Sequence, residues 1–268
     1  MVADSHPTSR RRFSETHLRV AIGATSILAL LAVWEALAQF GWIDARLSSR
    51  PTKVWIAALD LLSDLEFWTN AGVSFNEFIW GLLAACVIGI PLGIGMGSIR
   101  RLRLFLEPTV MLFYTVPRVT FLPLIILWFG IGFQAYAVLV FLGALFPIIV
   151  NCMAGVRQID PALVRAARSF GARPLSVFWL VLIPATMSFV MGGIRLGIGR
   201  GLIGIILGEM YFSVAGLGHM IMVYQAGLNT DKLMFLGFVV AISGVLMITG
   251  ARFLENRLAP WRVTRVAD

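Results

Sequence analysis

The stretch DPALVRAARSFGARPLSVFWLVLIP, from Asp160 to Pro184, separates two long apolar runs of the chain. Asp160 can cap a helix, Pro161 suits its first turn and Gly171 is typical of a helix end. The ten residues between cap and stop make about 15 Å of helix, too short to cross a bilayer. The sequence therefore predicts a short helix over about 160–171 that lies outside the membrane.

One face of this short helix carries small and apolar side chains, while Arg165 and Arg168 point elsewhere. The residues on that face are Leu163, Ala166, Ala167 and Phe170. Small side chains on an exposed helix allow the groove of another protein to approach closely. These features alone fit two interpretations equally well: a helix that docks to another protein, and an interfacial helix that lies on lipid.

The composition indicates a membrane protein. Of the 268 residues, 59% are hydrophobic and 13% are charged, against roughly 25% charged in an ordinary soluble domain. This leaves too little polar surface for a globule in water. The net charge of +8 comes from short basic clusters between apolar runs, a pattern that suits lipid headgroups better than a nucleic acid, so no nucleic-acid partner is expected.

A search for apolar runs of about 20 residues predicts an all-α polytopic protein with six transmembrane helices. The runs cover roughly 20–40, 75–98, 104–129, 134–154, 186–210 and 234–251. The first is interpreted as an uncleaved span rather than a signal peptide. Pro117 and Pro123 predict that the third is kinked or broken. The expected organisation is a cytoplasmic tail over 1–19, a transmembrane domain over 20–254 and a second cytoplasmic tail over 255–268.

Basic residues predict the orientation, because they gather on one side of this six-span arrangement. That side carries Arg10, Arg11, Arg12, Arg19, Arg100, Arg101, Arg103, Arg157, Arg165, Arg168, Arg173, Arg252, Arg257, Arg262 and Arg265. The other side carries Arg46, Arg50, Lys53 and Lys232. We therefore expect both termini and the 160–171 helix in the cytoplasm, and an amphipathic surface helix within 47–70 outside.

A motif across the opening stretch adds a family resemblance. Arg165-Ala166-Ala167, Gly171 and Val181-Leu182-Ile183-Pro184 keep the spacing of the signature Glu-Ala-Ala, three residues, Gly, nine residues, aliphatic, any residue, aliphatic, Pro. With its flanks, over about 70–255, the chain resembles the permeases of bacterial binding-protein-dependent ABC importers of the nitrate, sulfonate, taurine and bicarbonate group.

This resemblance implies the type I importer permease fold in the bacterial inner membrane, with a cytoplasmic coupling helix at 160–171 between spans four and five. The expected coupling residues are Asp160, Leu163, Arg165, Ala166, Ala167, Phe170, Gly171 and Pro184. The implied partners are a second permease copy, two ATPase subunits and a periplasmic or lipid-anchored substrate-binding protein. Arg165 replaces the acidic residue of the motif, a charge reversal that affects the expected partner on the ATPase.

Several enzyme and cofactor classes are not supported by the residues. The chain has no G-x-x-x-x-G-K-[ST] phosphate loop, so ATP and Mg are expected in the partner ATPase and no cofactor in this chain. The glycines Gly199, Gly201 and Gly204 form a G-x-G-x-x-G inside an apolar run without a preceding strand, which does not predict a dinucleotide site. No catalytic constellation or metal-ligand cluster stands out, and we expect no enzymatic activity.

Two rows of glycine at intervals of four predict tight helix packing. One row is Gly193, Gly197 and Gly201, and the other is Gly89, Gly93 and Gly97. Packing within the chain is the favoured interpretation, and packing against a second copy stays open.

Charged residues inside spans need a reason, because they are costly in lipid. The candidates for the substrate path are Arg118, Arg195, Arg200 and Glu209. The arginines either cap carbonyls and reach to an interface, or keep the path electropositive for an anionic solute. The expected function is the membrane-spanning permease subunit of an ATP-driven importer for a small, anionic solute. The alternative is a self-sufficient secondary transporter or channel, which would need coupling carboxylates near the midplane.

Overall fold

The computed structural model describes residues 9–42 and 48–258, and within that range every regular element is a helix. The elements are α1 (Ser9–Gln39), α3 (Pro51–Ser63), α4 (Leu65–Ser98), α5 (Arg100–Thr115), a 3₁₀ turn η1 (Arg118–Phe121), α6 (Leu122–Phe129), α7 (Phe133–Arg157), α8 (Pro161–Ser169), α9 (Pro174–Val177), a π segment η2 (Phe178–Leu182), α10 (Ile183–Phe212), α11 (Leu217–Ala226) and α12 (Thr230–Leu258). Arg46, Arg262 and Arg265, which entered the orientation argument, lie outside the described residues.

Among the described residues, five helical segments are long and apolar enough to cross a membrane, and a bent pair of helices brings the number to six. The five are Ala21–Gln39, Leu65–Ser98, Phe133–Arg157, Leu175–Phe212 and Thr230–Arg257. The bent pair, Arg100–Thr115 and Arg118–Phe129, corresponds to the third predicted run. The apolar runs therefore identified the spanning segments, although their ends differ.

The third run is broken, as its prolines predicted. Its two helical parts meet at an angle of 92°. Pro117 lies at the break, and Val116 before it has extended backbone angles (φ −69°, ψ 133°) because proline disfavours a helical residue at that position. Pro123 lies in the first turn of α6, where a missing N–H costs nothing. Pro117 thus makes the break and Pro123 does not.

The surface helix expected within 47–70 is shorter than predicted, because a new helix begins after Asp64. α3 ends at Ser63, and the Asp64 side chain accepts a hydrogen bond from the Glu66 N–H at 2.9 Å. This N-cap starts α4 at Leu65, so the second spanning helix begins well before the predicted residue 75.

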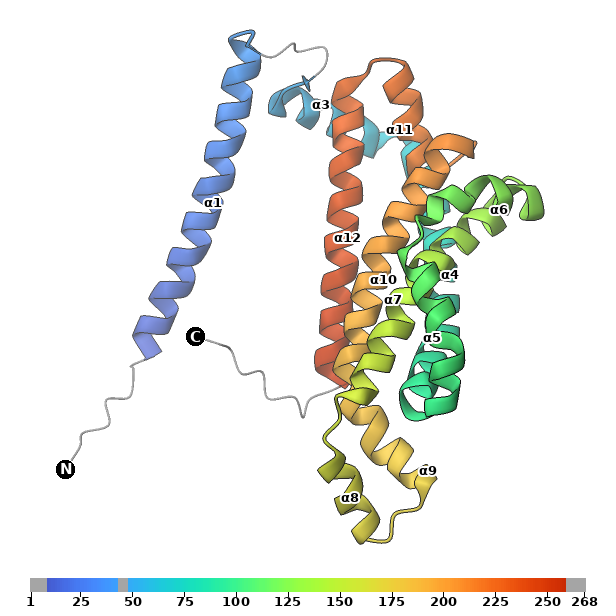
Figure 1. Ribbon diagram of the computed structural model, residues 1–268. Helices are drawn as coiled ribbons and strands as arrows, with labels where there is room; N and C mark the ends of the chain where they lie inside the picture. Colours follow the sequence, from blue (N-terminus) through green and yellow to red (C-terminus); the bar gives the residue numbers. More distant parts are fainter. Residues whose placement is uncertain (1–8, 43–47, 259–268) are drawn as a thin grey trace, which may run out of the picture. The chain divides into compact units, whose positions relative to one another are not determined.

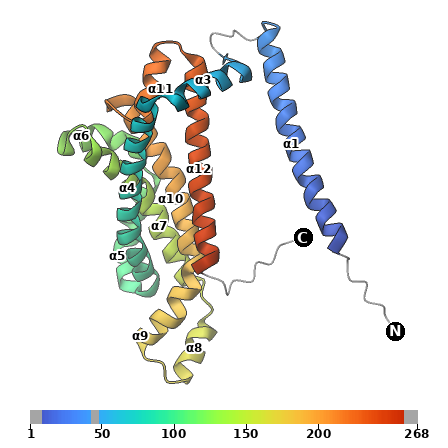
Figure 2. The same ribbon diagram turned by 180° about the vertical axis from the view of Figure 1, so that it is seen from behind.

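Helices α4, α7 and α10 pack together, with α7 contacting both of the others (Figures 1 and 2). Glycines make this closeness possible. A Cβ at Gly93 of α4 would lie 2.6 Å from the Ile149 carbonyl oxygen of α7. A Cβ at Gly193 or Gly197 of α10 would lie 3.0–3.1 Å from atoms of α7. Both glycine rows therefore face α7 within the same chain.

The most buried side chains line α7, and they form the centre of this bundle. Tyr136, Leu139, Val140 and Ile148 are fully buried. Phe146 stacks on Phe113 of α5 with ring centroids 5.7 Å apart, which attaches the first half of the broken span. Figure 1 shows α8 and α9 at one end of the bundle and α11 at the other.

A second compact unit comprises the described residues up to Ser63 together with Tyr224–Phe235. Within it, the Glu35 carboxylate accepts hydrogen bonds from the Thr52 backbone N–H at 3.1 Å and hydroxyl at 3.0 Å, joining α1 to α3. Lys232 forms an ion pair with Asp60 at 2.6 Å. In both contacts, a polar side chain near the end of another helix binds a polar group near an end of α3.

Candidate functional site

The short helix α8 forms where the sequence predicted it. The Asp160 side chain accepts a hydrogen bond from the Ala162 N–H at 2.8 Å, and Pro161 occupies the first helical position. After Ser169 the chain turns through Gly171, whose φ of +80° suits glycine. The Ala172 N–H then donates to the Ala167 carbonyl at 3.1 Å, which closes the helix end.

Most of the apolar face of α8 is exposed, although Ala167 is half-buried and the helix contacts α9 and the π segment. Phe170 is 93% exposed, and Leu163 and Ala166 are also exposed. Arg165 lies on the surface as well. A short, exposed helix with a large aromatic side chain at its end offers a contact surface to a partner or to lipid.

α8 connects to α10 through α9 and the π segment Phe178–Leu182. At its end the Ile183 N–H donates to the Phe178 carbonyl, the wide spacing of a π turn. Pro184 follows directly and has no N–H to donate. The motif proline therefore lies where the helical register changes, between the short helix and the long spanning helix.

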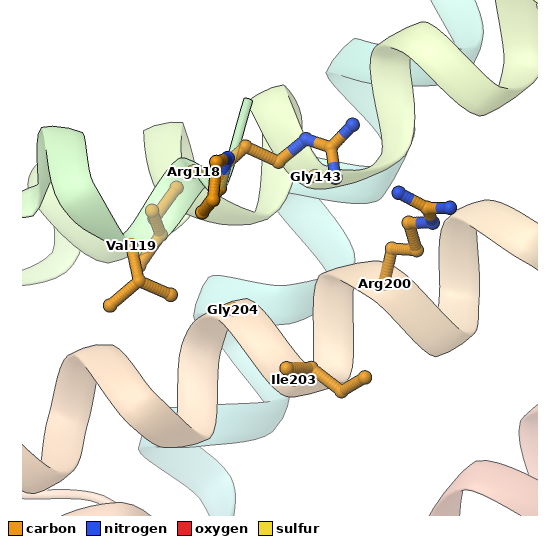
Figure 3. A pocket seen from close by; sticks show the side chains of 8 residues that line it. Arg118, Val119, Gly143, Arg200, Ile203 and Gly204 are labelled. Atoms are coloured by element: carbon orange, nitrogen blue, oxygen red, sulfur yellow. The ribbon is translucent and has the colours of Figure 1, made fainter. Parts of the chain in front are cut away.

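A pocket of about 290 Å³ lies between the break in the third span, α7 and α10. Figure 3 shows the side chains of Arg118 and Arg200 reaching into the same region, one from η1 and the other from α10. Gly143 and Gly204 supply part of the wall without side chains, and Ile203 adds an apolar surface. Two of the four predicted path residues are thus brought together.

Tyr114, which the sequence analysis did not single out, positions both arginines. Its carbonyl accepts a hydrogen bond from Nη2 of Arg118 at 3.0 Å, and its ring lies 4.9 Å from the guanidinium carbon of Arg200. The Nε of Arg118 is buried without a hydrogen-bond partner. Within the described residues neither arginine has a carboxylate partner, so the pocket is electropositive.

Arg195 lies in a different environment from the other two arginines. It forms an ion pair with the buried Glu255 of α12. Glu255 lies at the predicted start of the C-terminal tail, in the last turn of α12, which ends at Leu258. No spacing in the sequence indicates this partner, because the two residues come from helices far apart in the chain.

Glu209 lies with a second buried carboxyl group at the end of α10 near α11. Its Oε2 accepts hydrogen bonds from the Ser74 hydroxyl at 2.9 Å and the Gly218 N–H at 2.7 Å. Glu77 of α4 is its neighbour, and both side chains are buried. Glu77 was not among the site residues expected from the sequence. Its position facing Glu209 follows from the packing of α4 against α10.

These features together define a membrane-embedded transport subunit: apolar spanning helices, one of them broken beside a charged pocket, and an exposed capped helix at one end. Residues 89–263 match the family described as binding-protein-dependent transport system inner membrane component. The chain belongs to this family.

Curated relatives cover most of the chain. It is 32% identical to the taurine transport system permease protein TauC of Escherichia coli strain K12, over 91% of this chain and 90% of the relative. It is 30% identical to the putative aliphatic sulfonates transport permease protein SsuC of Bacillus subtilis strain 168, over 87% and 84%. The nitrate import permease protein NrtB of Leptolyngbya laminosa is 27% identical, over 97% and 99%.

The fold is that of a type I importer permease. A chain from the inward-facing MetNI methionine ABC transporter superposes with a TM-score of 0.58 at 20% identity, covering 74% of this chain and 98% of that one. The family match and the curated relatives make the chain a permease subunit of a binding-protein-dependent ABC importer in the membrane. The family functions with an ATPase and a substrate-binding protein, and its permease subunits have no ATPase site of their own. The self-sufficient transporter is not favoured.

Proposed function

We propose that this chain, paired with a second copy of itself, forms the path of a small anionic solute delivered by a periplasmic or lipid-anchored binding protein. The observation that carries the anion preference is the pocket in which Arg118 and Arg200 lie without carboxylate partners. Positive charge in a low-dielectric wall attracts anions. Relatives named for taurine, sulfonates and nitrate support the same chemistry.

The exposed face of α10 supports the pairing with a second copy. Leu196, Arg200 and Ile203 are exposed and recur at helical spacing, and a Cβ at Gly199 would meet nothing within 4 Å. An apolar face that carries one arginine suits a path shared between two subunits better than contact with lipid alone.

The ATPase partner docks at α8 in this proposal. Leu163, Ala166 and Phe170 form the contact surface, and each of two ATPase subunits binds ATP and Mg. Arg165 reverses the usual charge, so it pairs with an acidic residue of the ATPase. Both termini lie on the cytoplasmic side with α8, as the distribution of basic residues predicts.

Movement at α8 reaches the path through a short mechanical route. Closure of the two ATPase subunits displaces α8, and the displacement passes through α9 and the π segment into α10. Because Arg200 and the pocket wall at Ile203 and Gly204 belong to α10, rotation of this helix changes the opening of the pocket. Such rigid-body motion is a known mode of alternating access.

Uptake by the assembled transporter in proteoliposomes tests the anion path, with labelled taurine and nitrate as probes. We expect Arg200→Gln and Arg118→Gln to lower uptake of the transported anion about tenfold or more, the loss that follows from about 1.4 kcal/mol less attraction. Arg200→Lys keeps the positive charge and is the matched control, which should retain most activity. Uptake unchanged in both Gln variants overturns the anion path.

Co-purification of the detergent-solubilised chain with the ATPase encoded beside it tests the docking helix. We expect Phe170→Asp and Gly171→Asp to lose the ATPase that the wild type retains. Phe40→Asp is a matched control, because Phe40 is a similarly exposed phenylalanine just after α1. Retention of the ATPase by both α8 variants would assign α8 to the lipid surface instead.

A further inference from the structure

Two carboxyl groups from different helices meet in the interior near the loop 213–216 and the first turn of α11. Glu77 of α4 is 3% exposed and Glu209 of α10 is 0% exposed. The two side chains lie within hydrogen-bonding reach of each other. Oε2 of Glu77 and Oε1 of Glu209 are buried and have no protein partner. Two neighbouring buried carboxyl groups, each with an unpartnered oxygen, need a positive charge or a proton to balance them.

No basic side chain supplies that charge among the described residues. The ion pairs Arg103–Glu107, Arg195–Glu255 and Lys232–Asp60 involve neither of these two acids. The other titratable groups nearby are Tyr136 of α7, a phenol that is neutral at physiological pH, and His219, which follows Gly218 on α11. His219 donates no hydrogen bond to either carboxyl. Two ionised carboxylates this close repel strongly in a low-dielectric interior.

We propose that Glu77 and Glu209 form a proton-binding site in which the two carboxyl groups share one proton. The protonated carboxyl group of Glu77 donates a hydrogen bond to the carboxylate of Glu209. The pair of acids then carries a single negative charge. A pocket of about 320 Å³, lined by Glu77 together with Asn76 and Ser213, gives the proton a route to and from this site.

The shared proton stabilises the loop that follows α10 and the first turn of α11. Glu209 accepts the Gly218 N–H, and the Ser74 hydroxyl that donates to Glu209 accepts the Leu217 N–H at 2.8 Å. The Gly216 N–H donates to Oδ1 of Asn70 at 2.7 Å. A Cβ at Gly216 would lie 2.5 Å from Cδ of Glu209, so only glycine allows the carboxyl to approach this backbone. Loss of the proton puts two like charges under this loop and loosens it.

Infrared spectroscopy of the full chain in lipid nanodiscs tests the site directly, because a protonated carboxylic acid has a C=O stretching band that a carboxylate lacks. We expect the wild type at neutral pH to show this band and Glu77→Gln to lose it. Glutamine keeps the shape and donates the same hydrogen bond, so the variant should fold. Glu107→Gln, which removes a carboxylate paired with Arg103, is the control and should leave the band unchanged.

Amide hydrogen exchange gives a second measurement that reports on the loop. We expect the protection factors of Gly216, Leu217 and Gly218 to fall about tenfold or more in the wild type as pH rises from mildly acidic to mildly alkaline. In Glu77→Gln they should stay constant, because the amide has no proton to lose. Absence of the infrared band in the wild type, its persistence in Glu77→Gln, or loop protection that is independent of pH in the wild type overturns the shared-proton site.

Discussion

Arg195 and Arg200 lie on the same helix, five residues apart, yet they occupy opposite electrostatic environments. Five residues rotate a side chain by about 140° around a helix, so the two arginines project from different faces of α10. Arg195 pairs with the buried Glu255 of α12. Arg200 is exposed, lies over the ring of Tyr114 and faces a pocket without a carboxylate.

The difference shows that an arginine inside a spanning helix has two separate uses. A paired arginine joins two helices, and its charge is cancelled where it lies. An unpaired arginine keeps its charge available to whatever enters the pocket. The first should matter for folding and the second for transport, so the two sites can be separated by experiment.

The largest expected effect comes from breaking the paired site. Arg195→Gln removes the ion pair with the buried carboxylate of Glu255, and we expect it to destabilise the protein by about 3 kcal/mol. Thermal unfolding of the purified chain in detergent measures this change. The double variant Arg195→Met with Glu255→Met removes both charges and should recover most of the stability. A single variant as stable as the wild type would contradict the structural role of the pair.

A smaller loss of stability is expected when a glycine of α10 is replaced by a larger residue, and its size should depend on the face of the helix. Gly193→Leu forces a side chain against the backbone of Ile148 in α7, and we expect a loss of about 2 kcal/mol from overpacking. Gly199→Leu on the open face should cost little, because nothing lies within 4 Å of its Cβ position. The same unfolding measurement compares them, and equal losses would show that the second face is packed as well.

The smallest stability effect is expected at the unpaired arginine. Arg200→Gln should change the free energy of unfolding by less than about 0.5 kcal/mol, because an exposed side chain without an ion-pair partner is removed. The same variant should lose uptake. Arg195 is therefore expected to matter mainly for stability, and Arg200 mainly for transport. A large loss of stability in Arg200→Gln would show that its stacking on Tyr114 is structural.

Features that depend on neighbours in the chain were predictable. Apolar length identified each spanning segment, Pro117 predicted the break in the third one, and Asp160 and Gly171 delimited α8. Helix ends were less well predicted where a cap lay inside an apparently continuous pattern. Asp64 is the example, since it ends the surface segment and starts α4 earlier than its apolar run suggests.

Features that depend on distant residues were not predictable. The sequence marked Arg118, Arg195, Arg200 and Glu209 as charges that need a reason, and it treated the three arginines alike. Their partners Tyr114, Glu255 and Glu77 come from other helices at large separations along the chain. No periodicity within one helix carries that information.

The sequence by itself determined a lipid-embedded helical protein with a short capped helix between two spans, because hydropathy, prolines and caps act over a few turns of chain. Only the tertiary structure decided which arginine is neutralised, which faces a pocket, and which two acids meet beneath the Gly216 loop. The physical reason is that the energy of a charge in a membrane protein depends on what lies across the helix interface, and that neighbour is chosen by how α4, α7, α10 and α12 pack.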